Sequence, residues 1–319
     1  MAYIHILIGL VLLVGAGDIL VRGAVSMAQR MGISTLVIGL TVIALGTSAP
    51  ELVVGINAAL QGAPSLALGN VVGSNIANIL LVIGVPALVF PILCGEEEIR
   101  HNYIILLAGT ALFIAVCYMG TLNIGQGIFF ATLLIAFMVY SVRRTRKRIT
   151  YAKQALEDVE GVPSKPHSTP MALFLLVAGL AGVMYGADLL VDGSVVIARK
   201  YGVSEALIGL TIIAVGTSLP ELITAVMAAL HKHGDVAIGN VIGSNIFNMF
   251  GIMGATAITA PVPVGQSFLE MDLWIMASTT LILLPFAFLN ITIGRMTGAA
   301  FTIGYLCYLG LLGHQAQLF

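Results

Sequence analysis

The chain has 319 residues, of which 59% are apolar and 9% are charged, and its net charge is −1. A typical soluble domain carries about 25% charged residues, so this chain has too little charge to cover a globular surface in water. The composition excludes an ordinary soluble domain, and the balanced charge offers no basic surface for a nucleic acid.

Apolar runs of nearly twenty residues recur along the chain, separated by turn-forming or charged stretches. A helix needs about 20 apolar residues to cross the hydrocarbon core, where it satisfies its own backbone polar groups. We therefore predict an all-α membrane protein with ten transmembrane helices. The predicted spans are 3–29, 35–60, 66–90, 102–119, 124–142, 171–198, 204–230, 236–260, 270–289 and 297–316. The first lacks a basic start and a cleavage site, so we expect it to remain in the mature protein.

One long polar stretch, residues 143–170, separates the fifth predicted span from the sixth. It is charged at first and then rich in Pro and Ser, which predicts a linker between two five-helix halves at 1–142 and 171–319. Lys and Arg near the ends of spans favour the cytoplasm. A cytoplasmic linker places 12 of the 14 basic residues inside, so we expect both termini to lie outside.

The two halves repeat each other. Shifting the chain by 170 residues aligns 15–84 with 185–254 without a gap, and 33 of the 70 positions are identical. Each half has an odd number of predicted spans, so we predict two inverted-topology five-helix repeats with cores at 35–84 and 204–254. Such repeats place a substrate site near the middle of the membrane, although channels contain them as well.

The first repeated motif, "GTSAPE", breaks a predicted span. Pro50 lacks an N–H and clashes with the carbonyl of Gly46, so the backbone carbonyls around Ala44 to Thr47 are expected to lose their helical donors. Irregular backbone at this depth is tolerated only inside the protein or beside a hydrated cavity. Thr47 and Glu51 share one helix face, with Ser48 beside them. The second copy repeats these oxygen donors at Ala214, Thr217, Ser218 and Glu221.

The second motif is "GNVVGSNIAN" at 69–78, copied as "GNVIGSNIFN" at 239–248. Ser74 and Asn78 lie one helical turn apart on the same face. Gly69 and Gly73 have the small-xxx-small spacing that lets another helix approach closely. We therefore expect two broken helices and two closely packed partners to surround one central pocket.

Every candidate ligand in the two motifs is an oxygen atom, and neither motif contains Cys or His. Hard cations such as Ca²⁺ take 6–8 oxygen ligands, whereas transition metals recruit nitrogen or sulfur. Two glutamates supply two negative charges, which match one divalent ion or a few monovalent ions. A single Pro–Glu kink with a structurally paired acid is the plainer alternative, but two symmetric copies, each with a Ser/Asn face, favour a site.

The four motifs, in this order and spacing, resemble the two α-repeats of the cation/Ca²⁺ exchanger superfamily, on its sodium/calcium exchanger branch of prokaryotic type. The resemblance implies Na⁺-driven Ca²⁺ transport by alternating access, with the first and sixth helices sliding across the rest. It implies a prokaryotic inner-membrane protein that needs no cofactor and no obligate protein partner, with membrane lipid around it. The implied ligands of Ca²⁺ and Na⁺ are Glu51, Glu221, Thr47, Ser48, Thr217, Ser218, Ser74, Ser244, Asn78 and Asn248, with backbone carbonyls of Ala44 and Ala214.

Three other functions are weighed against this one. Some microbial members of the superfamily carry Asp where this chain has Asn248. Asparagine at this position disfavours an antiporter coupled to H⁺ or K⁺, but an H⁺-coupled or other divalent-cation antiporter stays the main alternative. A passive cation channel would show flux without a counter-ion. An enzyme is disfavoured because the sequence shows no nucleophile–base pair and no metal triad.

Several isolated polar residues carry weaker predictions. Asp18 and Asp188 are acids within spans, so they serve either at an entrance or sliding helix or as a structural pair. The acidic run 95–98 and the "HKH" at 231–233 are interpreted as solvated turns rather than metal sites. The cysteines are too widely spaced for a metal or redox site and are expected to be small core residues: Cys94, Cys117 and Cys307.

Overall fold

The computed structural model describes residues 2–94, 97–155, 167–203, 208, 212, 214–289 and 291–315, and this part of the chain is almost entirely helical. The helices are α1 (Ala2–Met31), α2 (Thr35–Ile38), α3 (Ala44–Thr47), α4 (Ala49–Leu60), α5 (Pro64–Leu80), α6 (Gly84–Val89), α7 (Glu97–Cys117), α8 (Ile124–Ala155), α9 (Thr169–Lys200), α11 (Ala214–Thr217), α12 (Leu219–Leu230), α13 (Gly234–Ile246), α14 (Met253–Thr259), α15 (Leu273–Leu281), α16 (Leu284–Phe288) and α17 (Arg295–Gln315).

Short π-helical segments interrupt these helices, and three of them have bounds within the described residues. They join α2 to α3 at Gly39–Ile43, join α13 to α14 at Phe247–Ile252, and precede α15 at Phe268–Asp272. Single π-helical turns within α-helices are frequent at functional sites. Two strands, β1 (Thr121–Leu122) and β2 (Val262–Pro263), form a small antiparallel ribbon at one end of the molecule.

Eight helical segments in the described residues are long and apolar enough to cross a membrane, and a bent pair made of Thr35–Thr47 and Ala49–Leu60 brings the number to nine. The chain is therefore an all-helical integral membrane protein. Of the predicted span 204–230, the structure describes α11 and α12, while most of residues 204–213 lie outside the described residues. The predicted number of ten spans thus stays a prediction.

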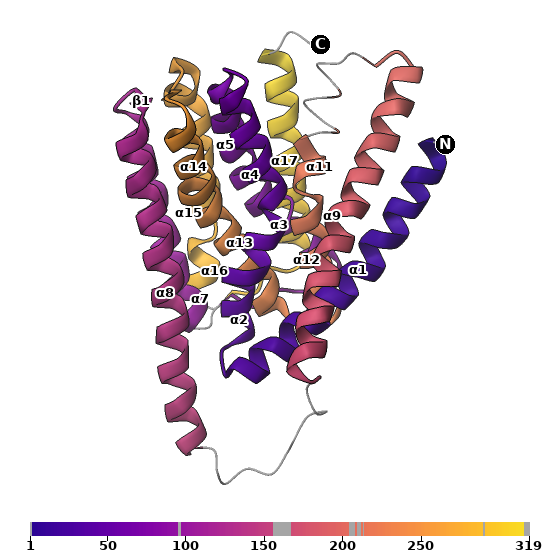
Figure 1. Cartoon of the computed structure of the whole chain (residues 1–319), viewed down its shortest axis with the longest axis vertical. Coiled ribbons are helices and arrows are strands. Elements are labelled where there is room, and N and C mark those ends of the chain that lie inside the picture. The colour runs from indigo at the N-terminus through magenta and orange to yellow at the C-terminus, as the bar shows by residue number, and fades with distance from the viewer. Residues whose placement is uncertain are drawn as a thin grey trace.

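The segment predicted as a linker begins as a helix, because α8 continues to Ala155. The rest of it, up to residue 166, lies outside the described residues, as do Gly95 and Glu96 of the predicted acidic turn. α1 begins and α17 ends toward one end of the molecule, whereas α8 ends and α9 begins toward the other end (Figure 1).

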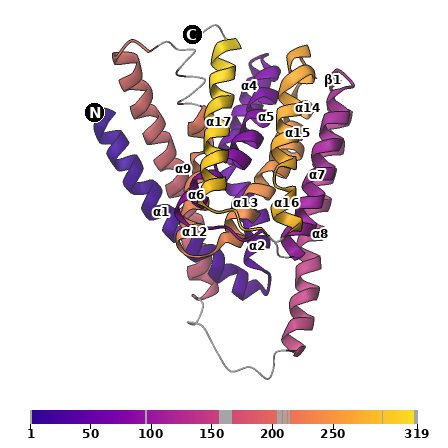
Figure 2. The ribbon, with the colours of Figure 1, turned by 180° about the vertical axis from the view of Figure 1, so that it is seen from behind.

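α5 and α13 form the centre of the molecule. All residues of α13 from Val236 to Ile246 are buried. The α1/α9 pair lies on one side of this centre and α8 on the opposite side (Figure 1). α17 packs against α5 and α6 on the side seen in Figure 2. The outer helices carry exposed Leu, Ile, Val and Phe side chains, as expected for a surface that faces hydrocarbon.

The cysteine prediction is correct for two of the three residues. Cys94 and Cys117 are free thiols in the core, where each fills a small volume. Cys307 is exposed on α17, so its assignment to the core was wrong. The helical pattern could not show this, because both faces of α17 are apolar.

α1 and α9 run antiparallel and touch along a seam of glycines. A Cβ added to Gly9 would lie 2.8 Å from the carbonyl oxygen of Gly186, and one added to Gly23 would lie 2.6 Å from the backbone nitrogen of Leu176. On α9, a Cβ on Gly193 would lie 2.7 Å from the carbonyl oxygen of Ala2. Small residues recur on this seam every seven positions, so the two backbones can meet over their whole length.

This seam generates the first prediction. The Gly23→Ala substitution places a methyl group against the backbone of α9 and should destabilise the protein by about 1–3 kcal/mol, the usual cost of overpacking. The matched control is Gly15→Ala, because a Cβ at Gly15 meets no atom within 4 Å. The melting temperatures of the two purified variants in detergent test this. Equal melting temperatures would show that the close approach of α1 and α9 is not required.

Candidate functional site

The helix that carries "GTSAPE" is broken at Ser48. The axes of Thr35–Thr47 and Ala49–Leu60 differ by 44°. Pro50 occupies the first turn of α4, where its missing N–H costs no hydrogen bond. The expectation that the Ala44 carbonyl loses its donor is wrong, because the Ser48 N–H donates to it over 3.0 Å. A carbonyl has two lone pairs, so this oxygen can still accept a further ligand.

The second copy of the motif repeats the break with different hydrogen bonds. Leu219–Leu230 again has its proline in the first turn and its glutamate at Glu221. Here the Ser218 N–H donates to the carbonyl of Val215 over 3.1 Å, three residues back rather than four. The two motif copies therefore differ in conformation, although their sequences differ only at Ala49 and Leu219.

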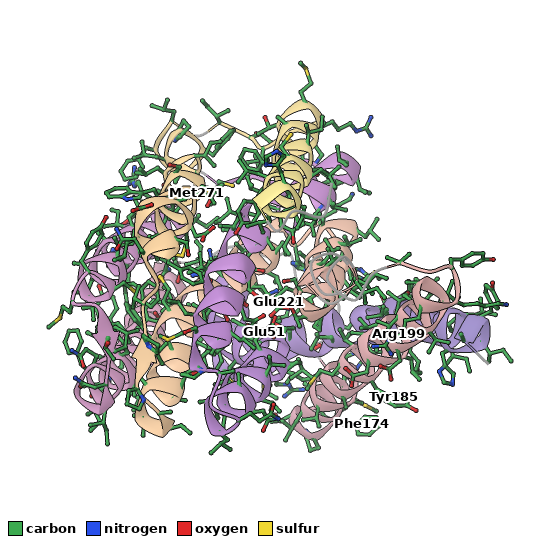
Figure 3. All side chains as sticks on the ribbon, turned by 90° about the horizontal axis from the view of Figure 1, so that it is seen from above. Glu51, Phe174, Tyr185, Arg199, Glu221 and Met271 are labelled. Atoms are coloured by element: carbon green, nitrogen blue, oxygen red, sulfur yellow. The ribbon has the colours of Figure 1, made fainter. Side chains whose placement is uncertain are left out.

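The two glutamates lie in the centre of the molecule, where Figure 3 shows them close together. Glu51 and Glu221 are each only 1% exposed. The Ser48 hydroxyl, three residues before Glu51, donates to Oε1 of Glu221 over 2.8 Å. This hydrogen bond joins the two halves of the chain directly and places both motif copies in one site.

α13 approaches the first broken helix very closely. Added Cβ atoms on Gly239 and Gly243 would lie 2.4 Å and 2.3 Å from the carbonyl oxygens of Leu36 and Leu40. The predicted close approach through the small-xxx-small spacing is therefore present in the second copy. For the first copy, with Gly69 and Gly73, the corresponding neighbours would be residues 206 and 210, which lie outside the described residues.

Four asparagines connect α5 with the end of α13 and the π-helical turn that follows it. Asn78 Nδ2 donates to Asn245 Oδ1 over 3.0 Å, and Asn248 Nδ2 donates to Asn75 Oδ1 over 3.1 Å. Asn75 and Asn245 also donate from Nδ2 to each other's backbone carbonyl, both over 3.4 Å. Residues 170 apart in the sequence thus make equivalent contacts.

Most of the predicted site residues lie in or beside this region. The hydrogen bonds bring Ser48 to Glu221 and link Asn78 and Asn248 through the other two asparagines. Ser74 and Ser244 are buried on α5 and α13. Thr217 is half-buried and also lines a neighbouring cavity. The backbones of Ala44 and Ala214 begin the short helices α3 and α11.

The sequence interpretation missed Asn75, Asn245 and Asn240. Asn240 is fully buried, and its Oδ1 lies 3.3 Å from the Thr47 hydroxyl that donates to it. Asn75 and Asn245 hold the other two asparagines. The signal that could have found them is the repeat itself, since every asparagine of the second motif is identical in both copies.

Several buried oxygens at this site have no hydrogen-bond partner in the described part of the chain. They are Glu51 Oε2, Glu221 Oε2, Asn78 Oδ1, Asn248 Oδ1, Ser218 Oγ and Ser244 Oγ. Leaving a buried polar atom unpaired costs about 1–3 kcal/mol, so a group of six needs a compensating interaction. All six are carboxylate, amide or hydroxyl oxygens that can accept, and a cation is the ligand that satisfies acceptors of this kind.

The charge of the site comes from two carboxylates alone. Among the described residues, no group of three or more His, Cys, Asp or Glu side chains could hold a metal ion. A bound cation would therefore complete its shell with neutral hydroxyl, amide and carbonyl oxygens, which are ligands suited to Ca²⁺ and to alkali cations. Two carboxylates balance one divalent ion or two monovalent ions.

The intramembrane acids Asp18 and Asp188 occupy different surroundings. Asp18 accepts from Arg22 over 2.9 Å and contacts His231 Nε2 over 2.5 Å, so it ties α1 to the end of α12. Asp188 and Asp192 instead line a cavity of 260 Å³ that reaches Thr217. Asp18 is thus a structural pair, whereas Asp188 borders an opening beside the site. His231 of "HKH" contacts an acid rather than forming a metal site.

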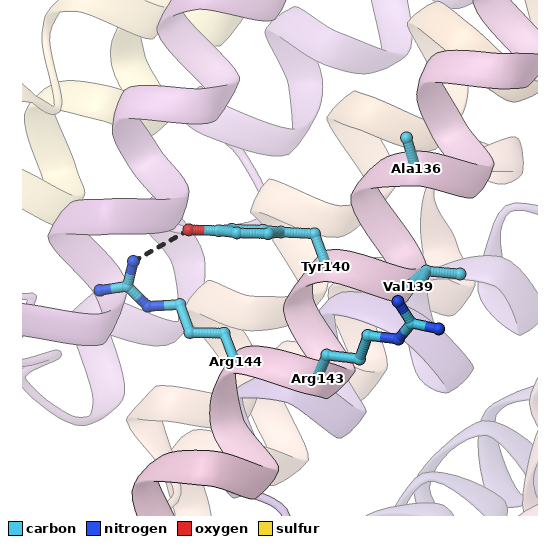
Figure 4. A pocket seen from close by; sticks show the side chains of 5 residues that line it. All are labelled: Ala136, Val139, Tyr140, Arg143 and Arg144. Carbon is cyan, nitrogen blue, oxygen red and sulfur yellow. Dashed lines mark hydrogen bonds between the residues drawn. The ribbon is translucent and has the colours of Figure 1, made fainter.

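A larger hollow of 510 Å³ lies on the surface of α8, away from the glutamates. Its lining includes Tyr140, Arg143 and Arg144, and Arg144 Nη1 donates to the Tyr140 hydroxyl over 3.0 Å (Figure 4). Of the described residues, two guanidinium groups and no carboxylate line this hollow. Its charge is therefore wrong for a cation, and the glutamate region is the better candidate.

Comparison with known proteins agrees with this geometry. A family model described as sodium/calcium exchanger protein matches residues 1–143 and 171–313. The chain is 38% identical to the putative antiporter CaxA of Alkalimonas amylolytica, covering 100% of this chain and 98% of that protein. It is 33% identical to the sodium/calcium exchanger MaX1 of Methanosarcina acetivorans, covering 97% and 98%. A solved structure of the sodium-calcium exchanger NCX_Mj superposes with a TM-score of 0.84 at 31% identity, over 98% of both chains.

The second prediction concerns the different hydrogen bonding of Ser48 and Ser218. In ion-free buffer, Ser48→Ala should lower the free energy of unfolding by about 1–3 kcal/mol, because it leaves Glu221 Oε1 buried without its donor. Ser218→Ala is the matched control, since the Ser218 hydroxyl has no partner among the described residues. Thermal unfolding in the presence of a chelator measures both. A loss for Ser218→Ala as large as for Ser48→Ala would contradict the asymmetry.

Proposed function

Because the chain belongs to the sodium/calcium exchanger protein family, we propose that it exchanges Na⁺ for Ca²⁺ across the membrane as a secondary active antiporter. The observation that carries this proposal is the pair of fully buried carboxylates, Glu51 and Glu221, among unpaired neutral oxygens. Family membership supports cation/Ca²⁺ antiport. The choice of Na⁺ as the coupling ion follows from the absence of a third acid among the ligands that we assign.

In this proposal the two glutamates hold Ca²⁺ at the centre, and neutral oxygens complete its shell and bind Na⁺ beside it. The hydroxyls and amides assigned to these roles are those of Thr47, Ser48, Thr217, Ser218, Ser74, Ser244, Asn78 and Asn248, together with the carbonyls of Ala44 and Ala214. Asparagine at both 78 and 248 means that these two positions bring dipoles and no charge. A site of charge −2 then accepts either one Ca²⁺ or Na⁺ ions that neutralise the same two carboxylates.

Exchange follows from the cost of charge in the membrane. An ionised carboxylate at the bilayer centre is unfavourable by several kcal/mol on most estimates. A pocket with two such groups is therefore reluctant to move across the membrane unless a cation neutralises it. Loading with either ion removes this barrier, so each movement of the site carries one kind of ion and the return carries the other.

We propose that the two halves are inverted repeats and that α1 and α9 slide together across the remaining helices. Their antiparallel course and their continuous glycine seam support this, because close backbone contacts along the seam join the two helices into one unit. The seam also joins the first helix of one half to the first helix of the other. Ten spans complete this arrangement when residues 204–230 are counted as one broken helix.

The orientation and the domain limits belong to the same proposal. Arg30, at the end of α1, donates to the backbone carbonyl of His167 just before α9, at the end of the molecule where α8 finishes. The rule that Lys and Arg favour the cytoplasm then places this end and the 143–170 linker inside and both termini outside. The halves are 1–142 and 171–319. The transported ions are the only ligands proposed, with no cofactor and no obligate protein partner.

The third prediction tests this function in proteoliposomes. Vesicles loaded with Na⁺ and diluted into Na⁺-free buffer should take up Ca²⁺, and vesicles without internal Na⁺ should not. Glu51→Gln and Glu221→Gln should each reduce this uptake to background, because one carboxylate cannot balance a divalent ion. Radioactive Ca²⁺ flux measures the uptake, and size-exclusion chromatography shows that each variant is folded.

Two results would overturn the proposal. Uptake that follows an imposed pH gradient and ignores internal Na⁺ would assign the chain to an H⁺-coupled antiporter. Full Ca²⁺ uptake by the folded Glu51→Gln variant would show that the central site lies elsewhere.

A further inference from the structure

The four asparagines at the centre do more than join α5 to α13. We propose that Asn75 and Asn245 are positioning residues that decide which atom of Asn248 and of Asn78 is available to an ion. This inference rests on the proposed function, since it concerns the ligands of the same site. It assigns a specificity-determining role to two residues that are not themselves ligands.

The direction of this network begins at two backbone carbonyls. The carbonyl oxygens of Asn75 and Asn245 can only accept hydrogen bonds. Asn75 donates to the Asn245 carbonyl through Nδ2, over 3.4 Å, so its side-chain oxygen Oδ1 must lie on the other side of its amide. Asn245 does the same toward the Asn75 carbonyl. An obligate acceptor therefore sets the orientation of each positioning amide.

The orientation of Asn75 and Asn245 determines the orientation of the side-chain amides of Asn248 and Asn78. Since Asn75 presents Oδ1, Asn248 must present Nδ2 to it, and these atoms are 3.1 Å apart. In the same way Asn78 presents Nδ2 to Asn245 Oδ1 over 3.0 Å. The remaining atoms, Oδ1 of Asn78 and Oδ1 of Asn248, are buried and have no partner among the described residues. Both amides thus keep an oxygen for the site, which a cation requires.

The opposite orientation of the Asn78 and Asn248 amides would weaken the binding of a cation. An asparagine amide carries two N–H donors at one end and an oxygen at the other, and the two ends have nearly the same shape. With Nδ2 toward the ion, N–H hydrogens that carry partial positive charge would stand where the ion needs an oxygen ligand. The positioning asparagines keep Oδ1 of Asn78 and of Asn248 free for the ion instead.

The contacts cross between the two halves of the chain. Asn75 of the first half orients Asn248 of the second half, and Asn245 of the second half orients Asn78 of the first. A purely structural role for Asn75 would affect both ligand asparagines alike. Orientation through hydrogen bonds instead predicts that Asn75 matters for Asn248 and not for Asn78.

The fourth prediction uses this crossing. Asn75→Leu removes the acceptor for Asn248 Nδ2 while keeping a side chain of similar volume. It should raise the KM for Ca²⁺ in Na⁺-loaded proteoliposomes by roughly ten-fold to a hundred-fold, because binding then leaves Nδ2 buried and unpaired. The maximal rate should change by less than about two-fold, since the ion-loaded site keeps the same charge.

The decisive comparison repeats Asn75→Leu in two other backgrounds. A carboxylate has no N–H to misplace, so Asn75→Leu should raise KM by less than about two-fold when Asn248→Asp is already present. When Asn78→Asp is present instead, the full ten-fold or larger increase should remain, because Asn245 orients that position. Melting temperatures in ion-free buffer report any general loss of packing.

Each outcome decides the proposal. An equal increase in KM in all three backgrounds, or no increase in any, would show that Asn75 does not orient Asn248. If Asn75→Leu does not fold, the mirror set of Asn245→Leu with Asn78→Asp and with Asn248→Asp gives the same test with the roles exchanged. Failure of the unsubstituted protein to take up Ca²⁺ would instead overturn the proposed function, so the two failures are distinguishable.

Discussion

The structure depends on two carboxylates held where water is absent. Glu51 and Glu221 are each 1% exposed at the centre of a protein whose outer helices expose apolar side chains. In such surroundings a charge must be balanced nearby, and in the described part of the chain no basic side chain forms a hydrogen bond or ion pair with either glutamate. In the proposed function a bound cation supplies this balance, so ion binding would also contribute to the stability of the fold.

The surrounding helices are shaped by the requirement to bring neutral oxygens to these two acids. Breaks at Ser48 and Ser218 end one helix and begin another beside each glutamate, so hydroxyls and helix ends meet in the core. Glycines on α13 let it approach the first broken helix to backbone contact. The asparagine network then fixes the direction of two amides. The helix breaks, the close approach of α13 and the asparagine network each bring polar groups into a packed interior that offers few other sources of oxygen.

The two halves carry the same motifs, but several equivalent residues make different contacts. The Ser48 hydroxyl is bonded to Glu221, whereas the Ser218 hydroxyl has no partner in the described part of the chain. Asp18 is held by Arg22 and His231, while Asp188, its counterpart 170 residues later, borders a cavity next to Thr217. Because α1 and α9 are antiparallel, these two acids lie toward opposite ends of the pair. A transporter that opens to one side at a time is expected to show such a difference between equivalent positions.

The sequence alone determined the class of the protein, the approximate limits of its helices and the residue types of its site. Apolar runs of membrane length permit little but helices, and a repeat of 33 identities in 70 positions identifies the polar residues that recur. Hydrogen-bond direction could not be inferred, because the carbonyl of Ala44 kept its donor despite Pro50, and nothing in the spacing shows where Asn75 points. Cys307 was misplaced because an apolar helix looks the same whether a face meets protein or lipid. Tertiary structure decided these points. The direction of Asn75 depends on Asn248, 173 positions away, and the exposure of Cys307 depends on which face of α17 meets the rest of the protein; local periodicity carries no information about either.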